Sequence, residues 1–361
     1  MKVLHCINSA KIGGIERLVI ELAIAQKEQG IDVTLMVDRS DGEFNDYIQK
    51  SGITVKNSGI KSGFDIRLRK LQELKQLFRQ YDIIHLHNFV FLLSLAGLSA
   101  KTVYTIHGLS KGIRRENFFK FLLRESFKKY FLNRVNYFVA NSAYTLSMAK
   151  EHYGLRRVPS KVILNGIRLP NIPEPNNIES TDIFTVGFIS RFVRRKRVDR
   201  LVNAFAEYLS KGGKGKLIMV GDGPEILNIK NMINKMGLND HVELPGFKRN
   251  VHDYYIKFDI CVHPSDNEGF GLVGVEAYSH GKPVIAFKDS GGLIEVIEPL
   301  EPENIVENEE AMAQRIMHYY SNRSEISTKS AARIAYARTN FSIERMEGDY
   351  FQIYKTVLMN D

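Results

Sequence analysis

The chain has 361 residues, of which 44% are hydrophobic and 25% are charged. At roughly 100–200 residues per domain this length predicts two domains, and the composition excludes a chain that is disordered over most of its length. No apolar run approaches the roughly 20 residues of a membrane-spanning helix, and the best candidate, Phe89 to Ala100, is expected to be a buried core helix.

The first residues and the two cysteines indicate a cytoplasmic protein. The short apolar run Val3 to Ile7 follows Lys2 directly and is typical of a first buried strand, not of a signal peptide. Cys6 and Cys261 both lie in strand-like segments, so we expect neither a disulfide framework nor a zinc site. A reducing cytosol is therefore the expected compartment.

Charge is unevenly distributed along the chain. Residues 1–170 carry 27 Lys and Arg against 14 Asp and Glu, a net charge of +13, whereas residues 171–361 carry 23 against 27, a net charge of −4. A basic first half suggests an anionic partner, either a membrane surface, an anionic acceptor or a nucleic acid. No motif for base-specific reading accompanies the charge, so a nucleic acid is not expected.

The first half alternates predicted strands with predicted helices. A strand at 2–8 is followed by a helix that opens at Gly13-Gly14 and runs to about residue 29. A second helix is predicted at 66–79, and the remaining predicted strands are 32–37, 82–87, 103–106, 137–140 and 161–164. This βαβα order predicts a parallel sheet with helices on both faces.

The pattern restarts after a segment rich in proline and asparagine. Residues 171–182 form the predicted linker between a first domain at 1–170 and a second domain at 183–341. In the second domain a helix is predicted at 198–211, and the predicted strands are 184–189, 216–220, 242–244, 260–263 and 284–287. Residues 342–361 are predicted as a C-terminal helix. Ligands of such folds bind at the carboxyl ends of the strands.

The motif with the clearest chemistry follows the predicted strand 260–263 and its loop. It consists of Glu268, Gly269, Phe270, Gly271 and Leu272, with Glu276 about one helical turn further along. The glycines let the backbone approach a ligand closely, and a helix N-terminus presents free N–H groups that suit a diphosphate. The two glutamates fit sugar and ribose hydroxyls better than a metal, because no Asp or His joins them. The alternative is a tight loop followed by a solvated helix face.

Together with further motifs in the same chain order, this segment resembles the GT-B-fold retaining glycosyltransferases of family 4. Glu268 and Glu276 match the Glu-x7-Glu motif of that family. The other matching segments are Gly13-Gly14-x-Glu16, Asp82-Ile83-Ile84-His85-x-His87, Thr105-Ile106-His107-Gly108, Asn165-Gly166, Ser190-Arg191-x4-Lys196, Gly221-Asp222-Gly223-Pro224, Gly281-Lys282-Pro283-Val284 and Gly291-Gly292-x-x-Glu295. The resemblance covers nearly the whole chain.

The resemblance implies an α/β protein of two Rossmann-like domains facing each other across a cleft, with the C-terminal helix crossing back to the first domain. It implies transfer of a sugar from a nucleotide-sugar donor, a UDP-sugar in preference to a GDP-sugar, to an acceptor hydroxyl with retained anomeric configuration. Glu268 would orient the donor sugar and Glu276 the ribose, without a metal cofactor. The acceptor would be a glycan or lipid-linked glycan of bacterial cell-surface polysaccharide or glycolipid synthesis.

Two cations follow the first predicted strand of the second domain. Arg191 and Lys196 lie where they can neutralise a leaving diphosphate, and both belong to the expected catalytic and donor-binding residues. Their neighbours Arg194, Arg195 and Arg197 are expected at the surface. Arg197 also stands where the resembling family has a glycine.

The N-terminal candidates are Gly13, Gly14 and His107. The two glycines do not form a G-x-G-x-x-G fingerprint, which argues against an NAD enzyme. In the resembling family this glycine loop packs over the donor phosphates and His107 faces the reacting sugar. His85 and His87 alternate on one predicted strand and share a face, with His85 expected in the core and His87 expected to reach the cleft.

The segment Lys111 to Arg134 mixes cations with aromatic residues. It holds eight Lys and Arg against two Asp and Glu, a net charge of +6. A basic amphipathic helix can lie on an anionic membrane, which would place the protein at the inner face of the cytoplasmic membrane. The alternative is an ordinary helix with one face in the core.

Two other functions fit part of this pattern. A nucleotide-sugar epimerase shares the two-domain architecture but would release a changed nucleotide sugar without an acceptor. A non-enzymatic polyanion-binding protein would use the basic first half alone. Titration with UDP and GDP, set against a nucleic-acid shift assay, separates the second alternative from a nucleotide-sugar enzyme.

Overall fold

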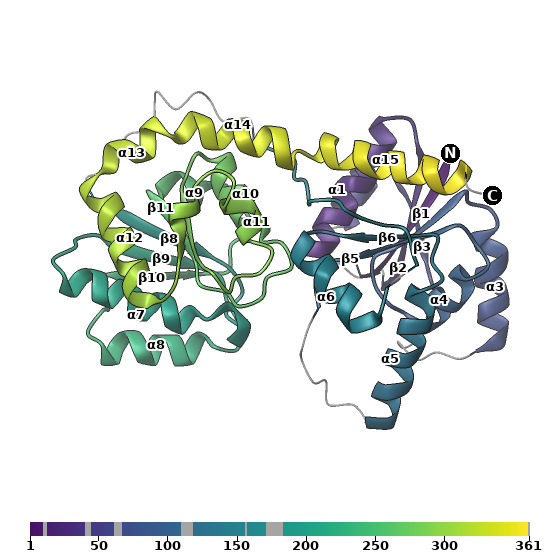
Figure 1. Ribbon diagram of the computed structural model, residues 1–361, viewed down its shortest axis with the longest axis horizontal. Coiled ribbons are helices and arrows are strands. Elements are labelled where there is room, and N and C mark those ends of the chain that lie inside the picture. The colour runs from purple at the N-terminus through teal and green to yellow at the C-terminus, as the bar shows by residue number, and fades with distance from the viewer. Residues whose placement is uncertain are drawn as a thin grey trace. The chain divides into compact units, whose positions relative to one another are not determined.

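The computed structural model describes residues 1–9, 13–39, 45–60, 67–109, 118–155, 157–170 and 183–359. The chain divides into two compact units. The N-terminal unit comprises Met1–Arg168 with Ser342–Asp361, and the C-terminal unit comprises Leu169–Phe341. Each unit is built around one parallel sheet with helices packed on it (Figure 1). The predicted linker 171–182 lies outside the described residues.

The N-terminal sheet has the strand order β3-β2-β1-β4-β5-β6-β7, and all of its pairings are parallel. Its strands are β1 (Lys2–Ser9), β2 (Asp32–Arg39), β3 (Thr54–Asn57), β4 (Ile83–Leu86), β5 (Thr102–Ile106), β6 (Tyr137–Ala140) and β7 (Ser160–Val162). Its helices are α1 (Gly14–Glu28), α2 (Asn45–Ser51), α3 (Leu68–Phe78), α4 (Phe91–Gly97), α5 (Phe118–Leu132), α6 (Ala143–Tyr153) and α15 (Ile343–Met359). Strands β4 and β5 are buried along their whole length, as strands covered by helices on both faces should be.

The last helix, α15, packs on the N-terminal unit beside α1. Its inward face buries Tyr350, Ile353 and Tyr354. Its first turn is attached to the segment after β7, because the Ile343 N–H donates to the Ile167 carbonyl and an Arg345 N–H donates to the Leu164 carbonyl at 2.6 Å. Helix α15 therefore contributes buried side chains to the core of the first unit.

The C-terminal sheet has the order β10-β9-β8-β11-β12-β13, again with parallel pairings. Its strands are β8 (Thr185–Ile189), β9 (Lys216–Val220), β10 (Val242–Gly246), β11 (Ile260–His263), β12 (Val284–Phe287) and β13 (Ile305–Val306). Its helices are α7 (Val198–Ser210), α8 (Ile226–Lys235), α9 (His252–Lys257), α10 (Leu272–Ser279), α11 (Ile294–Ile297), α12 (Glu309–Ser321), α13 (Arg323–Thr328) and α14 (Ser330–Phe341).

Both sheets share one topological feature that positions a site. The fourth consecutive strand returns to lie beside the first, so β4 pairs with β1 and β11 pairs with β8. The loops that leave the carboxyl ends of these strands diverge there, which opens the crevice in which doubly wound folds bind ligands. Each unit therefore has a candidate crevice formed by the loops after two neighbouring strands.

Most of the predicted elements are confirmed, and two short strands were missed. Helix α4 is a core helix as predicted, with Leu92, Leu93 and Ala96 buried. Cys6 and Cys261 lie in strands β1 and β11, as predicted, and both side chains are buried. Within the described part of the chain, no helix has both the length and the apolar character that crossing a bilayer requires.

Candidate active site

The loops after β8 and β11 bring Lys196 and Glu268 into contact. The Lys196 Nζ donates to Glu268 Oε1 at 2.5 Å, and the two residues are only 8% and 7% exposed. An Arg195 N–H lies 3.4 Å from each oxygen of the same carboxylate. Two residues 72 positions apart in sequence thus form a buried ion pair at the edge where β8 and β11 diverge. This is the position in which the fold places ligands.

Backbone contacts hold the two loops together around this pair. The Asp266 N–H donates to the Arg195 carbonyl, and the Arg197 side chain pairs with Asp266 at 3.3 Å. Arg197 itself has φ +44°, in the left-handed region that favours glycine. The backbone here needs the conformation that the family's usual glycine adopts freely, and Arg197 adopts it while forming ion pairs.

The electrostatics of the pair keep Glu268 ionised. Burial alone would raise the pKa of Glu268, but the charge of Lys196, together with His263 and Arg195, holds that pKa at about 2. Burial lowers the pKa of Lys196, and the Glu268 charge opposes that shift. Burial and the neighbouring Lys196 lower the pKa of His263 to about 3, so its ring is neutral at pH 7. The neutral ring can accept a hydrogen bond, and Ser265 Oγ lies 3.1 Å from its Nε2.

The predicted cations differ in their surroundings. Arg191 is exposed and forms no ion pair within the described residues, so its charge is available to an anionic ligand. Lys196 is buried against Glu268. Arg195, expected only at the surface, is exposed but contacts the Glu268 carboxylate, which the sequence reasoning missed. Arg194 is exposed as expected.

Two glycines explain how the loop after β8 is supported. A side chain at Gly221 would strike the Ser190 carbonyl, and one at Gly223 would strike the Phe192 carbonyl. The loop after β9 therefore lies backbone to backbone on the loop after β8, with the Phe192 N–H donating to the Asp222 carbonyl. The Gly-Asp-Gly-Pro motif thus supports the loop that carries the cations.

The predicted glycine segment leads directly into α10. Gly271 has φ +86° and caps the helix, and a side chain there would strike Leu293. The Phe270 side chain is buried and packs against Phe341, so any contact of Phe270 with a ligand would use its backbone. Gly269 and Leu272 are partly exposed on either side of this turn. The N–H groups of the first turn of α10 are thus the donors that this segment can offer to a phosphate.

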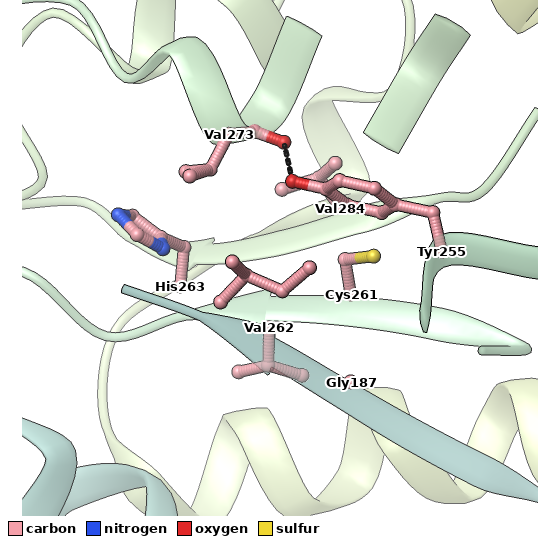
Figure 2. A pocket seen from close by; sticks show the side chains of 8 residues that line it. Gly187, Tyr255, Cys261, Val262, His263, Val273 and Val284 are labelled. Carbon is pink, nitrogen blue, oxygen red and sulfur yellow. Dashed lines mark hydrogen bonds between the residues drawn. The ribbon is translucent and has the colours of Figure 1, made fainter. Parts of the chain in front are cut away.

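Glu276 lies one turn into α10 and has a partner that the sequence did not indicate. The buried hydroxyl of Tyr255 donates to Glu276 Oε2 at 3.0 Å and also lies 3.4 Å from the Val273 carbonyl. Figure 2 shows Tyr255 at the edge of a small cavity beneath α10, with Cys261 on the strand below. The residues that line this cavity are mainly apolar, so we interpret the cavity as a packing gap. Burial raises the pKa of the Cys261 thiol to about 12.

In the N-terminal unit the candidates lie at the carboxyl ends of neighbouring strands. Gly13 is the N-cap of α1, and Gly14 is its exposed first residue. His107 directly follows β5, and its ring is partly exposed. His85 is fully buried, as predicted. The expectation that His87 reaches the cleft is wrong, because His87 is 3% exposed and its ring lies between His5 and His107.

Helix α5 places two of its cations against aromatic rings. Arg124 pairs with Glu125 and lies over the Phe121 ring. The Lys128 ammonium lies 4.8 Å from the centre of the Tyr153 ring, and burial lowers its pKa. The exposed side chains of the described part of α5 are Leu122, Leu123, Ser126, Lys129 and Tyr130.

Two family models match successive parts of the chain. The model of Glycosyltransferase Family 4 matches residues 12–169, and the model of Glycosyl transferases group 1 matches residues 170–340. Both agree with the resemblance that the motifs indicated, and together they extend over both units.

Known proteins resemble the chain in sequence and in structure. The gpi3 subunit of phosphatidylinositol N-acetylglucosaminyltransferase from Schizosaccharomyces pombe is 31% identical over 60% of this chain, which spans about half (48%) of that protein. The lipopolysaccharide core mannosyltransferase LpsB from Rhizobium meliloti is 25% identical over 64% of this chain and 68% of its own.

The structure of Anabaena Alr3699/HepE in complex with UDP-glucose superposes with a TM-score of 0.80. It is 22% identical and covers 99% of this chain and 100% of its own. This likeness confirms the predicted GT-B fold.

Proposed function

Because this chain belongs to the glycosyltransferases of family 4, we propose that it transfers a sugar from a UDP-sugar to an acceptor hydroxyl with retention of the anomeric configuration. The observation that carries the proposal is the buried Lys196–Glu268 pair, whose lysine lies on the same loop after β8 as the exposed Arg191. Cations at this edge suit the diphosphate, and a carboxylate suits the hydroxyls of the sugar attached to it.

Each donor-site residue has a role in this proposal. Arg191 and Lys196 stabilise the negative charge that develops on the leaving diphosphate, together with the first turn of α10. Glu268, kept ionised by Lys196, accepts hydrogen bonds from the donor sugar, and Glu276 accepts them from the ribose. These groups supply the charge stabilisation that a divalent metal would otherwise provide, so transfer is proposed to continue in EDTA.

The roles in the N-terminal unit rest on the family resemblance. Gly13 and Gly14 would let the entrance of α1 lie close to the donor phosphates, and His107 would contact the transferred sugar. No carboxylate is assigned the role of a nucleophile that attacks the donor sugar. A donor phosphate oxygen is proposed to take the proton of the acceptor hydroxyl, which keeps attack and departure on one face of the sugar.

A glycan or lipid-linked glycan is the proposed acceptor. One relative is named for phosphatidylinositol and another for the lipopolysaccharide core, which supports an acceptor attached to a lipid. The +13 charge of residues 1–170 and the exposed Leu122, Leu123 and Tyr130 of α5 support contact with an anionic membrane.

A transfer assay tests the donor and the mechanism. The purified chain is incubated with UDP-glucose, UDP-N-acetylglucosamine or GDP-mannose, and the products of transfer and hydrolysis are identified. We expect turnover of a UDP-sugar, persistence in EDTA, and an anomeric configuration in the product, read by NMR, equal to that of the donor. Release of an epimerised nucleotide sugar without an acceptor would favour the epimerase, and inversion would contradict retention.

A further inference from the structure

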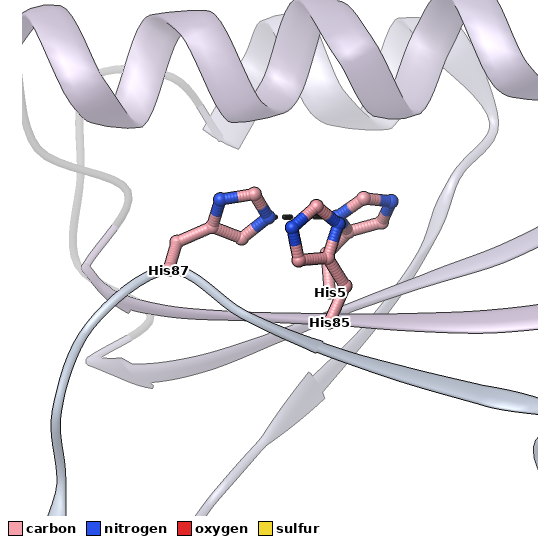
Figure 3. Close-up of side chains that lie close together, drawn as sticks. All are labelled: His5, His85 and His87. Atoms are coloured by element: carbon pink, nitrogen blue, oxygen red, sulfur yellow. Dashed lines mark hydrogen bonds between the residues drawn. The ribbon is translucent and has the colours of Figure 1, made fainter. Parts of the chain in front are cut away.

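A row of hydrogen-bonded side chains links α15 to His107 inside the N-terminal unit. His107 Nε2 lies 3.1 Å from His87 Nδ1, and His87 Nε2 lies 2.9 Å from His5 Nδ1. His5 Nε2 lies 2.7 Å from Gln26 Oε1, and Gln26 Nε2 donates to the Tyr354 hydroxyl at 3.3 Å. Figure 3 shows the rings of His87 and His5 facing each other. We name Gln26, His5, His87 and His107 the histidine relay.

The structure orients the Gln26 amide with Oε1 toward His5 and Nε2 toward the Tyr354 hydroxyl. The Tyr354 hydroxyl accepts a bond from Gln26 Nε2, so its own proton is directed to His85 Nδ1, 2.7 Å away. His85 then donates from Nε2 to Thr105 Oγ1 at 2.8 Å. With the amide oriented in this way, every bond in this branch has one donor and one acceptor, so the branch is compatible with Gln26 Oε1 facing His5.

Each ring of the relay carries a single proton at neutral pH. Burial lowers the pKa of His5 to about 4, against the opposing effect of its bond to Gln26, and burial lowers that of His107 to about 4. Burial and the neighbouring rings hold the pKa of His87 well below its usual value. A neutral imidazole has one donor nitrogen and one acceptor nitrogen, so fixing one of them fixes the other.

The amide oxygen of Gln26 therefore sets the tautomer of all three rings. An oxygen can only accept, so His5 carries its proton on Nε2 and accepts on Nδ1. His87 must then donate from Nε2 and accept on Nδ1, and His107 must donate from Nε2. At the end of the relay, His107 Nδ1 therefore carries no proton and is a hydrogen-bond acceptor.

That last atom lacks a partner in the described structure. His107 Nδ1 is shielded from solvent and no described residue donates to it, although the ring as a whole is partly exposed. A buried acceptor without a donor is rare in folded proteins, and a donor from a bound water or ligand commonly completes it. A sugar hydroxyl is such a donor.

The three inner histidines also meet the geometry of a metal cluster, since one nitrogen from each of His5, His85 and His87 lies within 4.8 Å of the others. However, both nitrogens of every one of these rings already lie within hydrogen-bond distance of a described side chain. A metal would have to break several of those bonds, whereas the relay uses all of them.

We propose that Gln26 is a positioning residue that acts through His5 and His87 to hold His107 as its Nε2–H tautomer, so that His107 Nδ1 accepts a hydrogen bond from a hydroxyl of the reacting sugars. The assignment of His107 to the transfer site rests on the proposed function. The tautomer itself does not.

Nitrogen-15 NMR of the full chain labelled in its histidines tests the tautomer directly, because protonated and bare ring nitrogens have well-separated shifts. We expect the Nε2–H form for His5, His87 and His107 at pH 7, assigned by single His→Asn variants. An Nδ1–H form of His107, or a shift of these signals on adding Zn²⁺ to the protein, overturns the proposal.

Three variants separate positioning from a structural role. Gln26→Glu retains an oxygen acceptor toward His5 and should keep the His107 tautomer. Gln26→Leu removes the acceptor and should give a mixture of tautomers at His107. Thr102→Val removes a hydroxyl that is equally buried in β5 but lies outside the relay, so it controls for lost stability and should leave the tautomer unchanged.

Kinetics complete the test. For Gln26→Leu we expect kcat to fall about tenfold, the rate equivalent of one hydrogen bond, with KM for the UDP-sugar little changed. Gln26→Glu should restore most of that loss. Unchanged kcat in a folded Gln26→Leu protein overturns the proposal. If the wild type turns over no nucleotide sugar, the proposed function has failed while the NMR experiment still decides the tautomer.

Discussion

The ammonium of Lys196 and the carboxylate of Glu268 lie 2.5 Å apart, and both residues are buried. Each charge is therefore stabilised mainly by the other. Removing one member leaves an unpaired buried charge, which typically costs about 3–5 kcal/mol. A substitution at either residue consequently changes both stability and activity, and the two effects have to be separated.

Arg191→Ala is the substitution that isolates the role of charge in catalysis. Arg191 is exposed and makes no ion pair within the described residues, so its loss should change the free energy of unfolding by less than about 0.5 kcal/mol. If it stabilises the leaving diphosphate, turnover should fall about 10²–10³-fold. Denaturant titration and a turnover assay measure the two effects. Lys196→Ala should lower turnover and stability together. Near-normal turnover in both variants would show that the diphosphate binds at other residues.

The Lys196–Glu268 pair also predicts a pH dependence of stability. The folded-state pKa of Glu268 is about 2 and its unperturbed value is 4.5, so the pair contributes fully above pH 4.5 and its contribution is lost as the pH falls toward 2. The contribution is on the order of 3 kcal/mol.

We expect Glu268→Gln to be less stable than the wild type at pH 7, with the difference shrinking progressively below pH 4.5. Urea unfolding of both proteins between pH 7 and pH 3 measures this difference. A gap of constant size across that range would contradict an ionised, paired Glu268.

Glu276→Ala should weaken UDP binding because the ribose loses a charged acceptor, a loss of about 1.5–3 kcal/mol. Tyr255→Phe is the matched variant, since it removes only the hydroxyl that orients the carboxylate at 3.0 Å. We expect calorimetry to rank affinity for UDP as wild type, then Tyr255→Phe, then Glu276→Ala. Equal affinity of Glu276→Ala and the wild type for UDP would show that Glu276 does not bind the ribose.

The sequence predicted the sheets better than it predicted the site. Strands such as 260–263 and 284–287 were predicted to the residue because they are buried, apolar and bounded by loops. Strand β3 was missed because it lies at a sheet edge with mostly exposed side chains, and β13 because its two residues leave no periodicity to detect. Strands β3 and β13 are both defined by pairing with a neighbouring strand. Such pairing cannot be recognised from the residues of a single segment.

The motifs located the site loops but not the partners inside them. Nothing in the spacing of Lys196 and Glu268 indicates that they touch, because the parallel order of β8 and β11 brings them together. Tyr255 and Gln26 were also missed. In the sequence, a buried polar residue of a helix cannot be distinguished from the other residues on its face. The one available signal was His263, which ends a buried strand at its carboxyl end.

Arg197 tests a departure from the family pattern. Its φ of +44° is strained for a residue with a side chain, while its ion pairs with Asp199 and Asp266 are partly exposed and weak, about 0.2–1 kcal/mol each. Arg197→Ala keeps the strain and loses the pairs, whereas Arg197→Gly loses the pairs but also the strain. The glycine variant should therefore be more stable than the alanine variant by about 0.5–1 kcal/mol in urea unfolding. The reverse order would mean that the loop does not need this conformation.

The last prediction concerns the exposed face of α5, formed by Leu122, Leu123, Ser126, Lys129 and Tyr130. Its apolar members can insert between lipid headgroups, and each basic residue near an anionic surface adds about 1 kcal/mol within a Debye length of about 8 Å. We therefore expect the protein to co-sediment with vesicles that contain phosphatidylserine, to be released by salt, and to ignore neutral vesicles.

The surroundings of each residue on α5 decide which substitutions test this contact. Arg124 and Lys128 lie against aromatic rings, so reversing their charge would disturb packing as well as binding. Lys129→Glu and the double variant Leu122→Gln with Leu123→Gln alter exposed groups only, and both should weaken vesicle binding while UDP affinity stays unchanged. Leu68→Gln and Arg69→Glu on α3 are matched controls, because these side chains are also exposed in the same unit. If all four variants bind anionic vesicles equally well, the membrane contact lies elsewhere on the protein. If the wild type does not bind anionic vesicles at low salt, the acceptor is not presented at a membrane through α5.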